Sequence, residues 1–218
     1  MSRVRVTLKL ATSLDGKIAL ANGDSEWVTG EAARRAGRAL RGEHDAIAIG
    51  SNTAVIDNPQ LTTRIGDLPD PVRVVFDTRL RLSPESNLAQ TADDIPVVVL
   101  TSDASTENAI SLKHLEVSVV EVPTDDRHVS IDEGLDALSR MGVRTLLVEG
   151  GGQLAAAFLR KGLVDTLEWY TAPILIGGDG RACVAALELG AMSDVQRWER
   201  VLLEELGPDL HERFERAL

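Results

Sequence analysis

The chain has 218 residues, with 34 acidic against 23 basic side chains, one cysteine and seven aromatic residues. This length suits one α/β domain, and 44% hydrophobic with 26% charged residues is typical of a globular chain rather than a disordered one. A net charge of −11 argues against broad binding to nucleic acid or anionic membranes, and a lone Cys183 excludes a disulfide framework. No apolar run approaches the roughly 18 residues of a membrane span, and no signal-peptide segment is visible, so we expect a soluble cytoplasmic protein.

The acidity is unevenly distributed. Residues 1–64 carry nine Lys or Arg against seven Asp or Glu, whereas residues 65–218 carry fourteen against 27. The difference has two interpretations, a solvated acidic surface over most of the chain or a set of cations for an anionic ligand in the first third. Charge patterning alone leaves both open.

The first half alternates strands with helical and turn segments. Residues 4–10 alternate apolar and polar positions, which predicts a half-buried strand. Asp15-Gly16 and Asn22-Gly23 are turn signals on either side of residues 17–20. Thr29 is a candidate N-cap for a helix over 31–40. Short apolar runs predict further strands at 46–49 and 72–76.

The second half continues the alternation. The sequence predicts strands over 95–100, 117–122, 143–148 and 167–172, and helices over 131–141 and 153–161. A glycine loop, Glu149-Gly150-Gly151-Gly152, joins the strand at 143–148 to the second of these helices. Two terminal strands, 201–206 and 210–214, are expected on either side of Gly207-Pro208-Asp209. We therefore predict a single α/β domain over 1–218, a three-layer αβα arrangement with a mostly parallel sheet, helices on both faces and C-terminal antiparallel strands.

The glycine loop is the first candidate site. Successive glycines after a strand let the backbone approach a ligand, and the following helix offers free N–H groups to an oxyanion. A tight strand-to-helix turn that needs positive φ explains the same glycines, so both interpretations stay open. Glu149 lies at the carboxyl end of its strand, where open α/β sheets bind ligands, and its carboxylate can accept hydrogen bonds from an amide or amine. A surface salt bridge is the alternative.

Lys9 is the second candidate. It lies on the polar face of a strand otherwise suited to burial, shortly before Ser13-Leu14-Asp15-Gly16-Lys17. A partly buried lysine can act as a proton donor or as a clamp for an anion, whereas a solvated lysine at a sheet edge would have neither role. Further along, the polar residues of 53–59 and 61–64 are explained equally well by a helix cap and a turn.

Other catalytic classes lack support. There is no G-x-S-x-G nucleophile motif, and the four histidines show no metal-binding spacing. The P-C-x-x-C segment that zinc deaminases combine with H-x-E is also missing. No metal site is predicted.

Taken together, the segments resemble the reductase domain of bacterial riboflavin biosynthesis proteins, the RibD C-terminal or pyrimidine reductase branch of the dihydrofolate-reductase-like fold. The resemblance extends over nearly the whole chain in order. It is carried by residues 8–19, 23–30, 33–34, 40–41, 45–47, 53, 57–59, 61–64, 73–77, 149–151 and 172–178.

This resemblance implies NADPH-dependent reduction of the ribosyl group of 5-amino-6-(5-phosphoribosylamino)uracil to ribityl. It implies substrate contacts at Ser25, Arg41, Leu61, Arg64 and Glu149. It implies an NADPH site lined by Ala11, Trp27, Thr53, Asp57, Thr78, Gly151, Gly152, Gln153, Leu154, Ala155, Ala156 and Ala157. Lys9, assisted by Asp57, is expected to supply the proton, and two arginines suit a sugar phosphate because guanidinium binds oxyanions bidentately.

The resemblance also implies a homodimer, for which the apolar strand at 201–206 offers a contact surface. Arg79 and Arg81 are candidate partners for the cofactor's 2′-phosphate. Many relatives carry an N-terminal deaminase domain, which we do not expect in this sequence because it starts at the reductase strand. Deamination would then come from another polypeptide, or the sequence is one domain taken from a longer protein. Two alternatives remain: a related NADPH reductase of a pterin-like or ketone substrate, and a non-catalytic nucleotide-binding partner of a separate deaminase.

Overall fold

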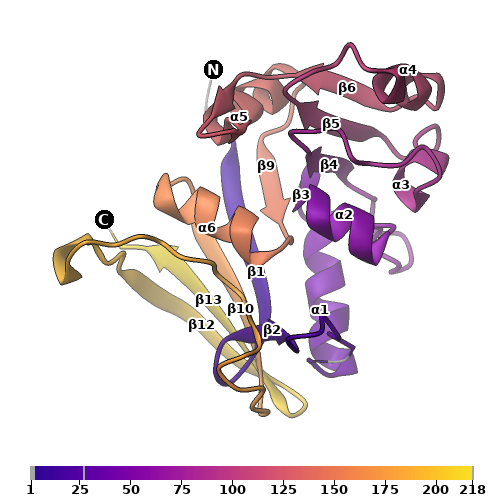
Figure 1. Ribbon diagram of the computed structural model, residues 1–218. Coiled ribbons are helices and arrows are strands. Elements are labelled where there is room, and N and C mark those ends of the chain that lie inside the picture. The colour runs from indigo at the N-terminus through magenta and orange to yellow at the C-terminus, as the bar shows by residue number, and fades with distance from the viewer. Residues whose placement is uncertain (1–2, 27, 218) are drawn as a thin grey trace. The chain divides into compact units, whose positions relative to one another are not determined.

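The computed structural model describes residues 3–26 and 28–217 (Figure 1). The chain divides into two compact units. The first unit comprises Met1–Arg5 and Arg38–Gly150, and the second comprises Val6–Gly37 and Gly151–Leu218. Helix α1 (Glu31–Gly42) contributes to both. The single domain over 1–218 stays a prediction.

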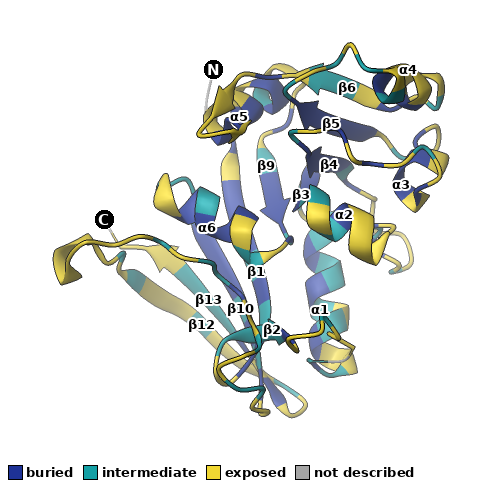
Figure 2. Cartoon of the chain, in the orientation of Figure 1, coloured by how far each residue is buried: buried dark blue, intermediate teal, exposed yellow. Residues whose placement is uncertain are grey.

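The first unit is built on a parallel sheet. Its strands, in spatial order, are β9 (Thr145–Val148), β3 (Ala46–Gly50), β4 (Val72–Phe76), β5 (Val97–Thr101) and β6 (Ser118–Glu121). Each neighbouring pair is parallel. Strands β4 and β5 are almost wholly buried (Figure 2), which agrees with their unbroken apolar sequences, since parallel sheets are covered on both faces.

Helices cover both faces of this sheet. They are α2 (Ser51–Asp57), α3 (Asn87–Gln90), α4 (Glu107–His114) and α5 (Ile131–Arg140), with a small hairpin of β7 (Thr124–Asp125) and β8 (His128–Val129) before α5. From β3 to β6 the chain moves steadily in one direction, and α5 then leads back to β9 on the other side of β3. Because crossovers are right-handed, this reversal places α5 on the face opposite α2 and α4. A Cβ added at Gly134 of α5 would lie 2.9 Å from Phe76 and 3.0 Å from Leu100, so α5 packs tightly on β4 and β5.

The second unit contains a mixed sheet. Its strands, in order, are β12 (Trp198–Leu206), β13 (Asp209–Arg216), β10 (Thr166–Ala172) and β1 (Arg5–Ser13). β1 and β10 are parallel, whereas β13 is antiparallel to both of its neighbours. The unit also holds α6 (Gly152–Arg160), the short pair β2 (Lys17–Ala19) and β11 (Arg181–Ala182), and a 3₁₀ turn at Met192–Asp194.

The predicted fold class is confirmed: the fold is α/β with a parallel sheet, helices on both of its faces and C-terminal antiparallel strands. The predicted cap of α1 is wrong. The helix begins at Glu31 and the Gly30 carbonyl accepts its first hydrogen bond from the Arg34 amide, so Gly30 rather than Thr29 occupies the N-cap position. The amide of Gly30 donates a hydrogen bond to Asp209 Oδ2 at 2.6 Å. Within the described residues, no helix is long and apolar enough to span a membrane.

Candidate functional site

The residues expected at the site fall in both units. Those in the first unit are Arg41, Thr53, Asp57, Leu61, Arg64, Thr78 and Glu149, and those in the second are Lys9, Ala11, Ser25 and the run Gly151, Gly152, Gln153, Leu154, Ala155, Ala156 and Ala157. Trp27 lies outside the described residues. The described candidates thus divide into two sets, one in each unit.

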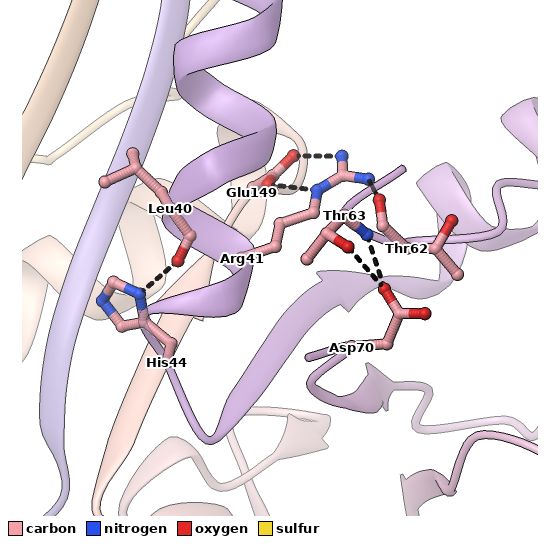
Figure 3. Close-up of polar contacts among 7 residues, drawn as sticks. All are labelled: Leu40, Arg41, His44, Thr62, Thr63, Asp70 and Glu149. Carbon is pink, nitrogen blue, oxygen red and sulfur yellow. Dashed lines mark hydrogen bonds and ion pairs between the residues drawn. The ribbon is translucent and has the colours of Figure 1, made fainter. Parts of the chain in front are cut away.

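An ion pair between Arg41 and Glu149 forms the centre of the site in the first unit (Figure 3). Arg41 lies in the last turn of α1, and Glu149 follows β9 directly. Arg41 Nε donates to Glu149 Oε1 and Nη2 donates to Oε2, both at 2.8 Å, and Nη1 donates to the Thr62 carbonyl at 2.8 Å. This bidentate geometry fixes both side chains and ties them to the segment at residues 58–64.

The pair is shielded from water. The side chains of Arg41 and Glu149 are only 15% and 7% exposed. Burial alone would lower the pKa of Arg41, but the Glu149 carboxylate outweighs it and the pKa lies above its ordinary value. Arg41 therefore stays charged. Three of its five N–H groups bind these partners, so the guanidinium retains donors for a bound oxyanion.

The segment at residues 58–64 has an unusual backbone. Asn58, Leu61 and Arg64 have φ values of 40°, 58° and 52°, in the left-handed region that residues other than glycine rarely occupy. Such conformations cost on the order of 1–3 kcal/mol each and persist only where the surroundings enforce them. Two of these three residues, Leu61 and Arg64, are predicted substrate contacts.

Several hydrogen bonds enforce this backbone. The Thr63 amide and hydroxyl both donate to Asp70 Oδ1, at 2.6 and 3.0 Å (Figure 3). Asn58 pairs through its side-chain and main-chain oxygens with Asn87, at 2.8 and 2.7 Å. From β4, the buried Arg73 donates to the Gln60 carbonyl at 3.3 Å, and burial lowers the pKa of Arg73. The segment is thus held in one conformation, which suits a preformed binding loop.

Topology points to the same edge of this sheet. The chain adds strands on one side of β3, as β4, β5 and β6, and then adds β9 on its other side. Open α/β sheets bind ligands beyond the carboxyl ends of the strands at such a switch point. Glu149 follows β9, and Thr53 and Asp57 lie in α2, which follows β3. Thr78 comes two residues after β4, where its hydroxyl accepts a hydrogen bond from the Val129 amide at 3.0 Å. The first-unit residues predicted for the cofactor therefore follow strand ends at this edge.

Gly150 is the position in the first unit where a side chain would do most damage. A Cβ there would lie 2.8 Å from both Cα and Cβ of Ile49. The Cα of Ile49 belongs to the backbone of β3 and cannot move aside as the end of a flexible side chain would. We expect Gly150→Ala to lower the free energy of unfolding by about 1–3 kcal/mol through overpacking. Urea denaturation measures this loss. Gly178→Ala is the control, because nothing lies within 4 Å of that Cβ position, and equal losses in the two variants would contradict the prediction.

In the second unit, Lys9 is partly buried on β1. Its Nζ lies 5.8 Å from the centroid of the Tyr170 ring. Ala11, two residues further along β1, shares its face and is partly exposed, whereas Ser25 lies in the exposed loop that precedes α1.

The N-terminus of α6 contains the glycines for which the sequence left an anion site and a tight turn open, and the anion site stays a prediction. Gly151 is the N-cap with φ 58° and no side-chain cap, and the first turn holds no acidic residue, so its N–H groups are available to an anion. A Cβ at Gly152 would lie 2.6 Å from the Ala182 carbonyl oxygen, so glycine is required there by close approach. The side chains of Leu154, Ala155 and Ala156 are buried, which leaves the backbone, Gln153 and the partly exposed Ala157 for ligand contact.

Sequence reasoning missed a buried polar cluster in this unit. Glu168 of β10 is 2% exposed and accepts hydrogen bonds from His211 Nε2 at 2.6 Å and Arg213 Nε at 2.5 Å. His211 is 4% exposed, bonds Glu204 Oε1 through Nδ1 at 2.6 Å, and stacks on Tyr170 with ring centroids 4.4 Å apart. The only sequence signal was a glutamate at a core-facing position of a strand, and its partners come from elsewhere in the chain.

His211 links stability to pH. Burial alone would lower the pKa of His211, but hydrogen bonds and attraction from Glu168 and Glu204 outweigh it and raise the pKa above its ordinary value. A raised folded-state pKa gives stability that is fully present below about pH 6.5 and is lost as pH rises through the folded pKa. We expect the free energy of unfolding to fall as pH rises through this window, with a slope of at most about 1.4 kcal/mol per pH unit. His211→Gln should abolish this dependence in pH-resolved urea denaturation, and an unchanged slope would contradict the assignment.

The Ser13–Lys17 motif is a structural clamp. Asp15 accepts hydrogen bonds from the Ser13 hydroxyl at 2.6 Å and from the amides of Ile176 and Gly177 at 3.1 and 2.7 Å. The Ser13 hydroxyl first, and then these amides, lower the pKa of Asp15 to about 2. The carboxylate therefore joins the turn after β1 to the loop after β10 at neutral pH. Among the described residues, no cluster of His, Cys, Asp and Glu side chains is arranged to hold a metal ion.

The fold and geometry define an α/β protein with a charged site beyond the carboxyl ends of its parallel strands. Residues 4–211 match the family model of the RibD C-terminal domain. The chain belongs to this family.

Three relatives illustrate the similarity. The chain is 38% identical over 208 residues to the riboflavin biosynthesis protein RibD of Bacillus amyloliquefaciens, covering 94% of this chain and 55% of that protein. It is 37% identical over 212 residues to the 2,5-diamino-6-ribosylamino-4(3H)-pyrimidinone 5′-phosphate reductase of Methanothermobacter thermautotrophicus, covering 95% and 96% of the two chains. The structure of Acinetobacter baumannii RibD superposes with a TM-score of 0.85 at 30% identity, over 99% of this chain and 58% of that one. The chain thus spans about half the length of the RibD relatives that it matches.

Proposed function

We propose that this chain reduces the ribosyl group of 5-amino-6-(5-phosphoribosylamino)uracil to a ribityl group with NADPH, in riboflavin biosynthesis. The observation that carries this proposal is the buried Arg41–Glu149 pair beside the constrained 58–64 segment, in a chain of the RibD C-terminal domain family. A charged, water-shielded pair of this kind is suited to a polar, phosphorylated small molecule.

The substrate would be held by the residues of the first unit. Arg41 is already neutralised by Glu149, so Arg64, which is exposed and has no partner among the described side chains, supplies the uncompensated charge for a phosphate. A carboxylate such as that of Glu149 accepts hydrogen bonds, which suits the N–H groups of an aminopyrimidine. This division assigns phosphate binding mainly to Arg64 and ring recognition to the Arg41–Glu149 pair.

The residues present fit a dinucleotide. The uncapped first turn of α6 after Gly151 suits a pyrophosphate, and the strand-end residues Thr53 and Thr78 suit a nucleoside. Arg79 is exposed without a described partner, whereas Arg81 donates to Asn52 Oδ1 at 2.6 Å, so Arg79 is the better candidate for the 2′-phosphate of NADPH. When bound, the cofactor supplies a hydride.

The chemistry requires one hydride and one proton. The substrate's ribosylamine opens to an imine, whose C1 atom accepts the hydride while its nitrogen accepts a proton. Lys9 would deliver that proton, directly or through water, and the partial burial of Lys9 limits competition from solvent.

The oxidation of NADPH, followed at 340 nm, tests the proposal. The expected substrate is the aminouracil, and dihydrofolate is the control for a pterin reductase. The undeaminated diaminopyrimidinone is included because the archaeal relative, matched over nearly its whole length, is named for that substrate. If none of the three compounds leads to oxidation of NADPH, but calorimetry shows that NADPH binds, the protein would instead be a non-catalytic nucleotide-binding partner of a separate deaminase.

A homodimer and a cytoplasmic location belong to the same proposal. Strand β12 is at the edge of the second unit's sheet, and Val201, Leu203 and Leu210 are 48%, 51% and 39% exposed. We expect Leu203→Glu to shift the protein from dimer to monomer in sedimentation equilibrium, because a charge in an apolar interface is costly. Lys113→Glu on α4 is the control, and a dimer that survives Leu203→Glu would place the interface elsewhere.

A further inference from the structure

The side chain of Lys9 is enclosed within the second unit. A Cβ added at Gly37 of α1 would lie 3.0 Å from Lys9 Cε and 3.4 Å from its Nζ, so the backbone of α1 passes directly over the end of the side chain. The Tyr170 ring lies 5.8 Å from the same ammonium. A lysine normally moves freely on its four-carbon stem, and these two walls restrict it.

Glu168 stands beside Lys9 on the neighbouring strand. The two residues are register partners in the parallel pair of β1 and β10, so their side chains project from the same face of the sheet. Glu168 is 2% exposed, and a carboxylate so deeply buried persists only when other groups satisfy it. His211 and Arg213 do so from β13, one at each oxygen.

The groups beside Lys9 are themselves fixed. The imidazole of His211 is held at Nδ1 by Glu204 and at Nε2 by Glu168, both at 2.6 Å. It stacks on Tyr170 with an angle of 2° between the rings. The carboxylate and the aromatic ring next to Lys9 are therefore anchored across three strands.

We propose that Glu168 is a positioning residue for Lys9: it fixes His211 against the Tyr170 ring, and that ring limits where the lysine ammonium can lie on this face of the sheet. The inference rests on the proposed function insofar as Lys9 is the proton donor there. A proton donor must stay within hydrogen-bond reach of the atom that it protonates, and supporting groups provide that precision. Glu168 acts through its neighbours and need not touch the substrate. It therefore belongs to no short motif of substrate-binding residues.

The test compares Glu168→Gln with the same substitution at Glu212. Glu212 lies on the opposite face of the same sheet, where it accepts a hydrogen bond from the exposed Arg200 at 2.9 Å. We expect Glu168→Gln to lower kcat by about 10- to 100-fold while KM changes little, because a displaced catalytic group costs about this much. Glu212→Gln should leave both constants unchanged. If Glu168→Gln does not fold, Glu168→Asp retracts the carboxylate by one methylene while keeping its charge, and the same readouts apply.

A double-mutant cycle separates positioning from a merely structural role. In the Lys9→Met background, Glu168→Gln should change kcat by less than about 2-fold, because the lysine on which it acts is gone. An undiminished effect in that background would overturn the proposal.

Side-chain NMR supplies a readout that does not depend on turnover. The chain has four lysines, so the Cε–Hε signals of labelled lysine are few and Lys9→Met assigns one of them. The two Hε protons of a fixed Lys9 should be inequivalent in the wild type and should merge in Glu168→Gln. If the wild type reduces no substrate but this change occurs, the proposed function fails and the positioning role stands. If the wild type is active and neither the NMR signal nor kcat changes in Glu168→Gln, the positioning role fails.

Discussion

Replacing Glu149 with methionine is expected to lower the free energy of unfolding by about 3–5 kcal/mol, because it leaves the Arg41 guanidinium charged and shielded from water without its carboxylate. The two side chains are 15% and 7% exposed, so solvent compensates little of the loss. Arg41→Met should be similarly destabilising, since it orphans the Glu149 carboxylate. Urea denaturation of the two variants measures both effects.

The double variant, Arg41→Met with Glu149→Met, separates stability from function. A buried ion pair replaced by apolar side chains of similar volume is often neutral or stabilising, so the double variant should regain most of the lost stability. It should not regain turnover, because the groups proposed to bind the substrate are gone. Its kcat/KM is expected to stay at least about 100-fold below that of the wild type, which corresponds to about 2.7 kcal/mol of transition-state stabilisation. A double variant with full activity would contradict the proposed role of the pair.

The fold was largely predictable because its strands carry strong local signals. The alternation of Val4, Val6, Leu8 and Leu10 predicted β1, and the apolar runs of β3, β4 and β5 are those of strands buried on both faces. Helices α2, α3 and α4 were not predicted. They have seven, four and eight residues, too few for a 3.6-residue periodicity to emerge from sequences as polar as Ser51–Asp57. Their stability comes from packing on the sheet rather than from their own sequence.

The site was predictable only as a set of residues. Arg41 and Glu149 were both expected to bind the substrate, but they are 108 positions apart and nothing in the sequence pairs them. The left-handed backbone at Leu61 and Arg64 is likewise invisible in a stretch without glycine, because it is imposed by Arg73, Asp70 and Asn87. Long-range contacts of this kind override local preference, and only the fold reveals them.

The surroundings of Lys9 show the same limit. The sequence placed this lysine on the polar face of its strand, which left a solvated lysine as the alternative. The structure places Gly37 over it and Tyr170 beside it, and neither residue was a candidate for the site. The partial burial of Lys9 thus has a cause in the packing of α1 on β1, which no window of sequence around residue 9 contains.

Lys9→Met is therefore the substitution with the largest expected effect on turnover. A positioned general acid contributes about 10²- to 10⁴-fold to a rate, so kcat should fall by that factor while KM changes little. Methionine is close to lysine in length and is compatible with the space between Gly37 and Tyr170, so the free energy of unfolding should change by less than about 1 kcal/mol. Lys113→Met, at an exposed lysine near the end of α4, is the matched control and should leave kcat unaffected.

The outcome also decides which step of the reduction depends on the lysine. If Lys9 only bound the substrate, Lys9→Met would raise KM and leave kcat intact, whereas loss of a proton donor lowers kcat and kcat/KM together. Single-turnover measurements with prebound NADPH make the distinction direct, because product release then does not contribute to the observed rate. A folded Lys9→Met variant that turns over at the wild-type rate would eliminate Lys9 as the proton donor and leave Asp57, at the end of α2, as the remaining candidate among the residues predicted to be catalytic.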